Sequence, residues 1–285
     1  MYMILSGVLA SFCKCMPVAW FGGDACDLTG IDKNPLKEYL SIVCMKMRFN
    51  NRNDVLEYEK RLTKGGYPGI LFDVVLAELT GCKEIIDVGA GNGFFSIPLA
   101  RQGFIVKAVE PSAEMIKVFQ DKIDKQITSL INIYHSNWES WEGKKSDALI
   151  CIHAIYTMNI DKAIQKMKLH SNKSLLIIRS DEETTALSWL IRKEMNIERR
   201  LLKHTRMRVT SIFNEHHIKF ITKDIEISKV LFFENIEDAL GYYCFSLGVG
   251  SFSQKTVRKI IEAHLKWKNG KLYTLEKYWE KLFIF

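Results

Sequence analysis

The sequence lacks any long apolar run, any strong excess of one charge and any regular spacing of cysteines. No stretch reaches the roughly 18 to 20 apolar residues that a membrane-spanning helix needs, so we expect no membrane segment. The 40 Lys and Arg residues against 33 Asp and Glu give a net charge of +7 on a mixed surface. That balance favours an ordinary solvated surface over a nucleic-acid footprint. The seven scattered cysteines are typical of a reducing cytoplasm.

The first thirty residues carry little that indicates structure or chemistry. Cys13, Cys15 and Cys26 lack both the two-residue spacing and the second ligand pair of a metal site, so we expect no metal. Residues 1–12 faintly resemble the apolar part of a signal peptide, but no basic residues precede them. We therefore expect a cytoplasmic protein in which residues 1–32 form an irregular extension.

The rest of the chain shows no repeat, low-complexity tract or linker, which favours a single domain over residues 33–285. Apolar residues at steps of three and four predict a helical cap within 33–81, with helices over 35–49, 53–62 and 70–80. A core over 82–180 follows, where short apolar strands alternate with helices. The strands are predicted at 84–88, 104–110, 131–135, 147–152 and 173–178, and the helices at 94–101, 112–124 and 160–169. This alternation predicts an α/β fold with a doubly wound, mostly parallel sheet.

After Arg179 the alternation ends, and residues 181–285 read as helical additions and last strands. The pattern predicts helices at 184–204, 208–216, 236–246 and 254–267, a strand region at 218–233, and a last strand or pair at 271–285. We expect the added helices to form a lid.

Residues 84–93 combine a β-branched run, an acidic residue and three alternating glycines ahead of a helix. Glycines permit a turn too tight for side chains, so backbone N–H groups and the positive end of the helix can approach a ligand. A dinucleotide-binding loop would read G-x-G-x-x-G, but here the third glycine comes one position early and Phe94 takes its place. The loop predicts a ligand site and argues against a dinucleotide.

The spacing of this loop resembles motif I of the class I S-adenosylmethionine (SAM) methyltransferases. The resemblance implies a seven-stranded sheet and a SAM site built by Asp87, Gly89, Ala90, Gly91 and Gly93. SAM has no pyrophosphate, and the glycines would leave room for its amino-acid part and ribose.

Glu110 closes the next predicted strand, 21 residues after Gly89. A carboxylate at the end of a strand can accept hydrogen bonds from both ribose hydroxyls. The segment Glu110-Pro111-Ser112-x-x-Met115 is similar to the second motif of the same family, which implies that Pro111 and Met115 also lie at the cofactor.

Asn137 and Trp138 follow the third predicted strand and resemble the stretch that meets adenine in this family. Asn137 could bond the adenine amino group or a ring nitrogen, and Trp138 could cover the ring. Asn137 could equally be a turn residue and Trp138 a core residue, and Trp141 could serve in place of Trp138.

His153 and Tyr156 follow the fourth predicted strand, where open α/β sheets place ligands beyond the carboxyl ends. They are the candidate catalytic residues, and His153 is also a candidate cofactor contact. His153 could act as a general base or could simply hold a loop. Tyr67 resembles the tyrosine that precedes motif I in small-molecule methyltransferases, and this implies a further cofactor contact. The sequence lacks the Asn-Pro-Pro-Tyr type of motif found in amino-group methylases.

Together these features predict transfer of a methyl group from SAM to a small molecule, with S-adenosylhomocysteine (SAH) as product and a monomer or homodimer as the active form. A basic run between residues 192 and 208 leaves an RNA or protein substrate open, although such a run is more often a solvated helix face. The sequence is also compatible with a non-catalytic SAM-binding partner protein and, less well, with an NAD-dependent dehydrogenase.

Overall fold

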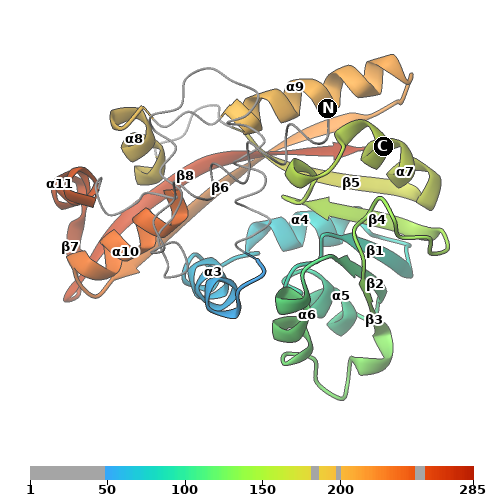
Figure 1. Cartoon of the computed structure of the whole chain (residues 1–285), viewed down its shortest axis with the longest axis horizontal. Coiled ribbons are helices and arrows are strands. Elements are labelled where there is room, and N and C mark those ends of the chain that lie inside the picture. The colour runs from blue at the N-terminus through green and yellow to red at the C-terminus, as the bar shows by residue number, and fades with distance from the viewer. Residues whose placement is uncertain (1–48, 181–185, 197–199, 248–253) are drawn as a thin grey trace, which may run out of the picture.

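The computed structural model describes residues 49–180, 186–196, 200–247 and 254–285 (Figure 1). The predicted extension over 1–32 and the predicted helix over 35–49 lie outside the described residues, apart from Phe49. None of the described helices is both long and apolar enough to cross a bilayer.

The centre of the molecule is a single twisted sheet with the strand order β3-β2-β1-β4-β5-β8-β6, with β7 paired to β8. The first five strands are parallel: β1 (Glu84–Val88), β2 (Ile105–Glu110), β3 (Ile131–His135), β4 (Ser146–Ile152) and β5 (Ser171–Ser180). Three antiparallel strands complete it: β6 (Ile221–Phe233), β7 (Lys266–Lys268) and β8 (Lys271–Ile284). The mostly parallel α/β sheet is confirmed, but it has eight described strands and not seven. The additional strand β7 ends the stretch that was predicted to be helical to residue 267.

Helices cover both faces of the parallel half (Figure 1). They are α4 (Ile70–Glu78), α5 (Ser96–Arg101), α6 (Ala113–Gln120) and α7 (Ile160–His170), with 3-10 turns at Thr128–Leu130 and Ile155–Thr157. Helix α3 (Arg52–Lys64) packs against α6. Ser112 caps α6, because its Oγ accepts a hydrogen bond from Met115 N at 3.1 Å. Strands β1 and β4 are buried along almost their whole length, which is why apolar residues stand at consecutive positions in both.

The predicted long helix over 184–204 is wrong. The structure has two helices, α8 (Leu187–Glu194) and α9 (Arg200–Glu215), and the predicted helix at 208–216 is the second half of α9. Asn196 takes a left-handed φ of 53° directly after α8. A left-handed residue at this position ends a helix, and asparagine tolerates it better than most residues do.

Helices α8, α10 (Ile236–Leu247) and α11 (Gln254–His264) surround the far end of the long antiparallel pair β6–β8 (Figure 1). They form an apolar cluster of their own with the strands, which includes Ile191, Phe233, Tyr243, Ile261 and Leu272. This cluster is built on strands β6 and β8 rather than on the parallel strands, and the lid role of these helices stays a prediction.

Candidate functional site

The three glycines that follow β1 all have left-handed backbone angles, with φ of 71° at Gly89, 56° at Gly91 and 82° at Gly93. A Cβ on Gly89 would lie 2.3 Å from Cβ of Ala154, and one on Gly93 would lie 2.4 Å from the ring of Phe119. A Cβ on Gly91 would meet nothing within 4 Å. Gly89 and Gly93 therefore allow close packing inside the protein, whereas Gly91 presents bare backbone to open space.

Glu110 ties this loop to the end of β2. Its Oε2 accepts a hydrogen bond from Gly91 N at 2.8 Å, and its Oε1 accepts one from Ser112 N at 2.8 Å. Burial raises the pKa of Glu110, while these two backbone N–H groups oppose the rise. A carboxylate has about four lone-pair sites, so two remain for ribose hydroxyls.

Two further polar groups lie buried beside the glycine loop. The Ser96 hydroxyl donates to Asp87 Oδ2 at 2.6 Å, and burial raises the pKa of Asp87 to about 7. Asn92 is 2% exposed, and its Nδ2 has no hydrogen-bond partner within the described residues. Sequence reasoning did not select Asn92, and its place between two glycines of the motif is the signal that could have found it. Its amide nitrogen is a donor that is free for a ligand.

Two predicted cofactor contacts, Pro111 and Met115, lie at the start of helix α6, and a third, Ala90, lies in the glycine loop. Pro111 is exposed, and its carbonyl oxygen lies 3.1 Å from His135 Nε2. Met115 is 3% exposed and packs with Val55 of α3. Ala90 is buried with the apolar core below the loop. The side chain of Met115 thus joins α3 to α6 in this structure.

The two predicted adenine contacts, Asn137 and Trp138, have different surroundings in the structure. Asn137 is exposed, and its Oδ1 accepts a hydrogen bond from Ser140 N at 2.8 Å, as a turn residue does. Trp138 is 1% exposed, stacks on Trp141 with ring centroids 5.5 Å apart, and donates from Nε1 to Ala163 O. These contacts favour Trp138 as a core side chain and Asn137 as a turn residue whose Nδ2 stays available.

His153 and Glu280 form a hydrogen-bonded pair beyond the end of β4. His153 Nε2 lies 2.6 Å from Oε2 of Glu280, whose side chain is fully buried. His153 has a left-handed φ of 57°, which is strained for a residue that is not glycine. Arg179 Nε lies 3.7 Å from the other Glu280 oxygen. Sequence reasoning did not select Glu280. Its place on the same face of β8 as the apolar Leu282 and Ile284 is a signal that could have found it, but the sequence did not indicate that its partner is His153.

Tyr67 and Tyr156 flank this pair. The Tyr67 ring lies 6.2 Å from the His153 ring and packs edge-on against Phe94 and Phe95. Burial raises the pKa of Tyr67 well above its usual value, so its hydroxyl stays protonated at neutral pH. The Tyr156 hydroxyl accepts a hydrogen bond from Arg179 N at 2.8 Å. Tyr67 thus joins the glycine loop to His153, and Tyr156 fixes the end of β5.

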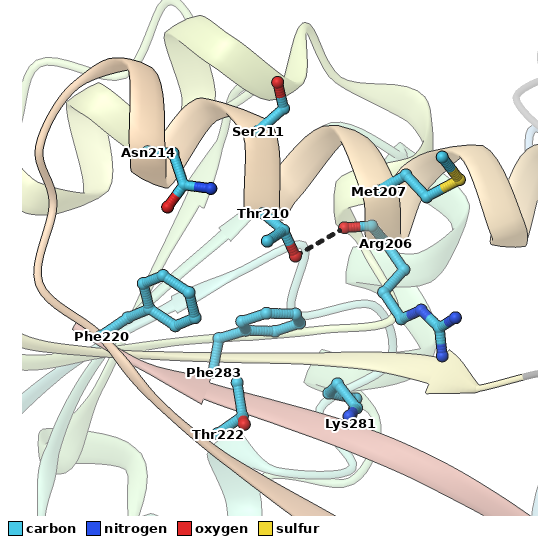
Figure 2. Close-up of a pocket in the computed structure, with 9 residues that line it drawn as sticks. All are labelled: Arg206, Met207, Thr210, Ser211, Asn214, Phe220, Thr222, Lys281 and Phe283. Carbon is cyan, nitrogen blue, oxygen red and sulfur yellow. Dashed lines mark hydrogen bonds between the residues drawn. The ribbon is translucent and has the colours of Figure 1, made fainter.

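A separate groove of about 600 Å³ lies between α9 and strands β6 and β8 (Figure 2). It is lined by Arg206, Met207, Thr210, Ser211, Asn214, Phe220, Thr222, Lys281 and Phe283. No predicted site residue contributes to it.

The fold and the loop together define the class of this protein. A solved structure from Anabaena variabilis, assigned as a methyltransferase of an antibiotic biosynthesis pathway, has a TM-score of 0.55 and 16% identity. It covers 75% of this chain and 95% of its own. The fold is therefore the class I methyltransferase fold.

The sequence comparisons identify the domain. Residues 85–173 match the family model described as a methyltransferase domain, so this chain contains a methyltransferase domain. Glycine/sarcosine N-methyltransferase of Aphanothece halophytica is 33% identical over 81 residues, 27% of this chain and 30% of that protein. Ubiquinone biosynthesis O-methyltransferase of Rickettsia akari is 31% identical over 110 residues, 38% of this chain and 43% of that protein. The chain thus spans less than half the length of either curated relative.

Proposed function

We propose that this protein binds SAM and transfers its methyl group to a small molecule. The observation that carries the proposal is the pairing of Gly91 with Glu110. Gly91 offers bare backbone to open space, and Glu110 holds that backbone in place while keeping lone pairs for a ribose. The unpartnered Asn92 amide nitrogen adds a buried donor at the same loop. These groups fit a nucleoside that carries hydroxyls and an amino-acid tail.

When bound, SAM supplies a methyl group on a positively charged sulfonium. The glycine loop, Glu110 and Tyr67 would hold and orient the cofactor, and Asn137 could meet adenine through Nδ2. Positioning of the two reactants then supplies much of the rate.

His153 is suited to take a proton from the acceptor. Because the Glu280 carboxylate accepts a hydrogen bond, the proton of a neutral imidazole belongs on Nε2, which leaves Nδ1 as the acceptor. Nδ1 makes no hydrogen bond within the described residues. This is the arrangement of a base held in one tautomer by a buried acid.

The small-molecule acceptor is favoured over RNA because the basic run is not a free cationic face. It is divided between α8 and α9, and Arg208 lies 3.3 Å from Glu215 and 3.8 Å from Asp161. The two curated relatives are named for glycine or sarcosine and for ubiquinone biosynthesis. A cytoplasmic location and a monomeric or dimeric state belong to the same proposal.

Calorimetry with SAM, SAH and NAD tests the cofactor. We expect SAM and SAH to bind and NAD to bind more weakly, and the reverse order would overturn the proposal. Release of SAH across a metabolite panel then tests turnover. SAM binding with no turnover on any metabolite, RNA or protein fraction would favour a non-catalytic SAM-binding protein.

A further inference from the structure

One face of the antiparallel part of the sheet carries a row of charged and polar side chains. In the strand register Arg179 of β5 lies opposite Glu280 of β8, and Lys229 of β6 lies opposite Glu276 of β8. Tyr278 lies between the two acids on β8. Alternate residues of a strand point to the same face, and paired residues of neighbouring strands share a face. The face that is apolar at Leu282 and Ile284 therefore becomes polar next to His153.

Both acids of this row already have partners. Glu280 holds His153, and Glu276 Oε1 accepts hydrogen bonds from the Tyr243 hydroxyl at 2.7 Å and from Leu187 N at 3.1 Å. Glu276 is 3% exposed, and burial raises its pKa. Glu280 Oε1 accepts no hydrogen bond and lies 3.7 Å from Arg179 Nε, and neither acid makes an ion pair with Lys229 within the described residues.

The two cations of the row share one aromatic ring. The Arg179 guanidinium and the Lys229 ammonium each lie 5.6 Å from the centroid of Tyr278. Within the part of the chain that the structure describes, Lys229 makes no hydrogen bond or ion pair. Burial, and then the charge of Arg179, lower the pKa of Lys229 to about 8. The Arg179 side chain is 39% exposed, so a ligand can reach it.

Arg179 and Lys229 repel each other beside a candidate base, and the carboxylates of Glu276 and Glu280, which oppose this effect on Lys229, form no ion pair with it within the described residues. An anionic group bound there would receive charge-assisted hydrogen bonds from both and would relieve their repulsion. Arg179 also approaches Glu280, which holds His153, so such a group would fix the rest of the molecule next to the base.

We propose that Arg179 and Lys229 bind a carboxylate of the methyl acceptor. The inference rests on the proposed function and names the substrate class of that site. The two cations could instead bind the carboxylate in the amino-acid part of SAM. The experiment must therefore separate an acceptor carboxylate from the cofactor carboxylate.

The experiment uses the full-length protein saturated with SAH and matched probe pairs. The pairs are 4-hydroxybenzoate with 4-hydroxybenzamide, and hexanoate with hexanamide, which differ in charge within each pair. Binding is followed by NMR of the 13C-dimethylated lysines, in which the Lys229 signal should respond to the carboxylates. We expect at least one carboxylate to bind about tenfold more tightly than its amide, as one charged hydrogen bond implies.

Three variants make the test specific to Lys229. Lys229→Met should reduce the preference for the carboxylate, because only Arg179 remains, and Lys229→Arg should keep it. Lys223→Met should also keep it, since Lys223 lies on the same strand but is paired with Glu78. No preference in the wild-type protein, or a preference that Lys229→Met leaves undiminished, would overturn the inference.

Affinities for SAH and for methylthioadenosine, which lacks the amino-acid part, identify the source of the anion. If Lys229→Met weakens the binding of SAH but not that of methylthioadenosine, Lys229 binds the cofactor carboxylate and the inference is wrong. If SAH fails to bind the wild-type protein, the proposed function itself is wrong. Normal SAH binding without a charge preference counts against the carboxylate acceptor alone.

Discussion

His153 Nε2 lies 2.6 Å from Glu280 Oε2, although the two residues are 127 positions apart in the chain. The parallel half of the sheet delivers the histidine at the end of β4, and the antiparallel half delivers the acid from β8. Because β8 lies beside β5, which in turn lies beside β4, a carboxylate from the last strand reaches the candidate base. The site thus depends on both halves of the sheet.

Glu280→Gln should leave the fold intact but reverse the imidazole tautomer. A glutamine amide can donate to Nε2, so the ring proton would move to Nδ1 and the candidate base would be lost. We expect the rate of methyl transfer to fall about 10² to 10⁴-fold for any acceptor found by SAH release, while SAH affinity stays unchanged. The 15N shifts of the His153 ring should show the change of tautomer.

A matched control for this variant is Glu226→Gln. Glu226 is exposed on β6 and pairs with Lys277, so its loss should change neither the rate nor the ring shifts. Unchanged turnover in Glu280→Gln with a proton still on Nε2 would show that Glu280 does not position a base.

Gly91→Ala and Gly89→Ala should separate binding from folding. At Gly91 the added methyl meets nothing within 4 Å, so the cost is about 1 kcal/mol for the left-handed backbone, but the methyl enters the space left for the cofactor. At Gly89 the methyl would lie 2.3 Å from Cβ of Ala154, and about 1 to 3 kcal/mol of overpacking adds to the backbone cost. Urea unfolding and SAM calorimetry on both variants check the contrast. Full SAM affinity in Gly91→Ala would contradict the assignment of that space to the cofactor.

Glu110→Ala should weaken SAM binding by about 1 to 3 kcal/mol, because the ribose hydroxyls lose their acceptor and Gly91 N loses the oxygen that holds the loop. Calorimetry measures the loss directly. Glu114→Ala is the control, since Glu114 pairs with Lys117 on the adjacent helix and should leave SAM affinity unchanged. Equal affinities in the two variants would mean that Glu110 serves only the loop.

The local elements could be predicted from sequence because their signals are short-range. The predicted strand at 84–88 coincides with β1, since Ile85, Ile86 and Val88 are β-branched and Gly89 marks the end of the strand. The predicted helix at 184–204 failed because an asparagine, and not a glycine, takes the left-handed position after α8. Strand β7 has only three exposed residues and gives no periodic signal.

The glycine loop and Glu110 could be found because their spacing is fixed within one strand-loop-helix unit and the next strand. Glu280, Lys229 and Arg179 could not be grouped in this way. Their meeting depends on the antiparallel register of three strands, in which Arg179 pairs with Glu280 and Lys229 with Glu276. Trp138 stays a predicted adenine contact, and its 1% exposure and its stacking on Trp141 favour the alternative of a core side chain.

Asp87→Asn should change how stability depends on pH. Burial raises the pKa of Asp87 to about 7 in the folded protein, whereas an unfolded chain has an aspartate pKa of about 3.9. Between these values the folded state binds the extra proton, so the wild-type protein loses stability as pH rises from about 4 to 7. The full loss is on the order of 4 kcal/mol. Asparagine can still accept from the Ser96 hydroxyl and carries no charge, so it should remove this loss.

Urea unfolding at pH 5 and pH 8 checks the prediction. Relative to wild type, Asp87→Asn should be markedly more stable at pH 8 than at pH 5, because only the wild-type protein must bury the charged Asp87 carboxylate at the higher pH. The raised pKa of Glu110 acts in both proteins and largely cancels in the difference. Asp73→Asn, at an exposed position on α4, should follow the wild-type curve. If Asp87→Asn also follows it, the aspartate is not the source of the pH dependence, and the carboxylate of Asp87 must be stabilised in its charged form by a group other than Ser96.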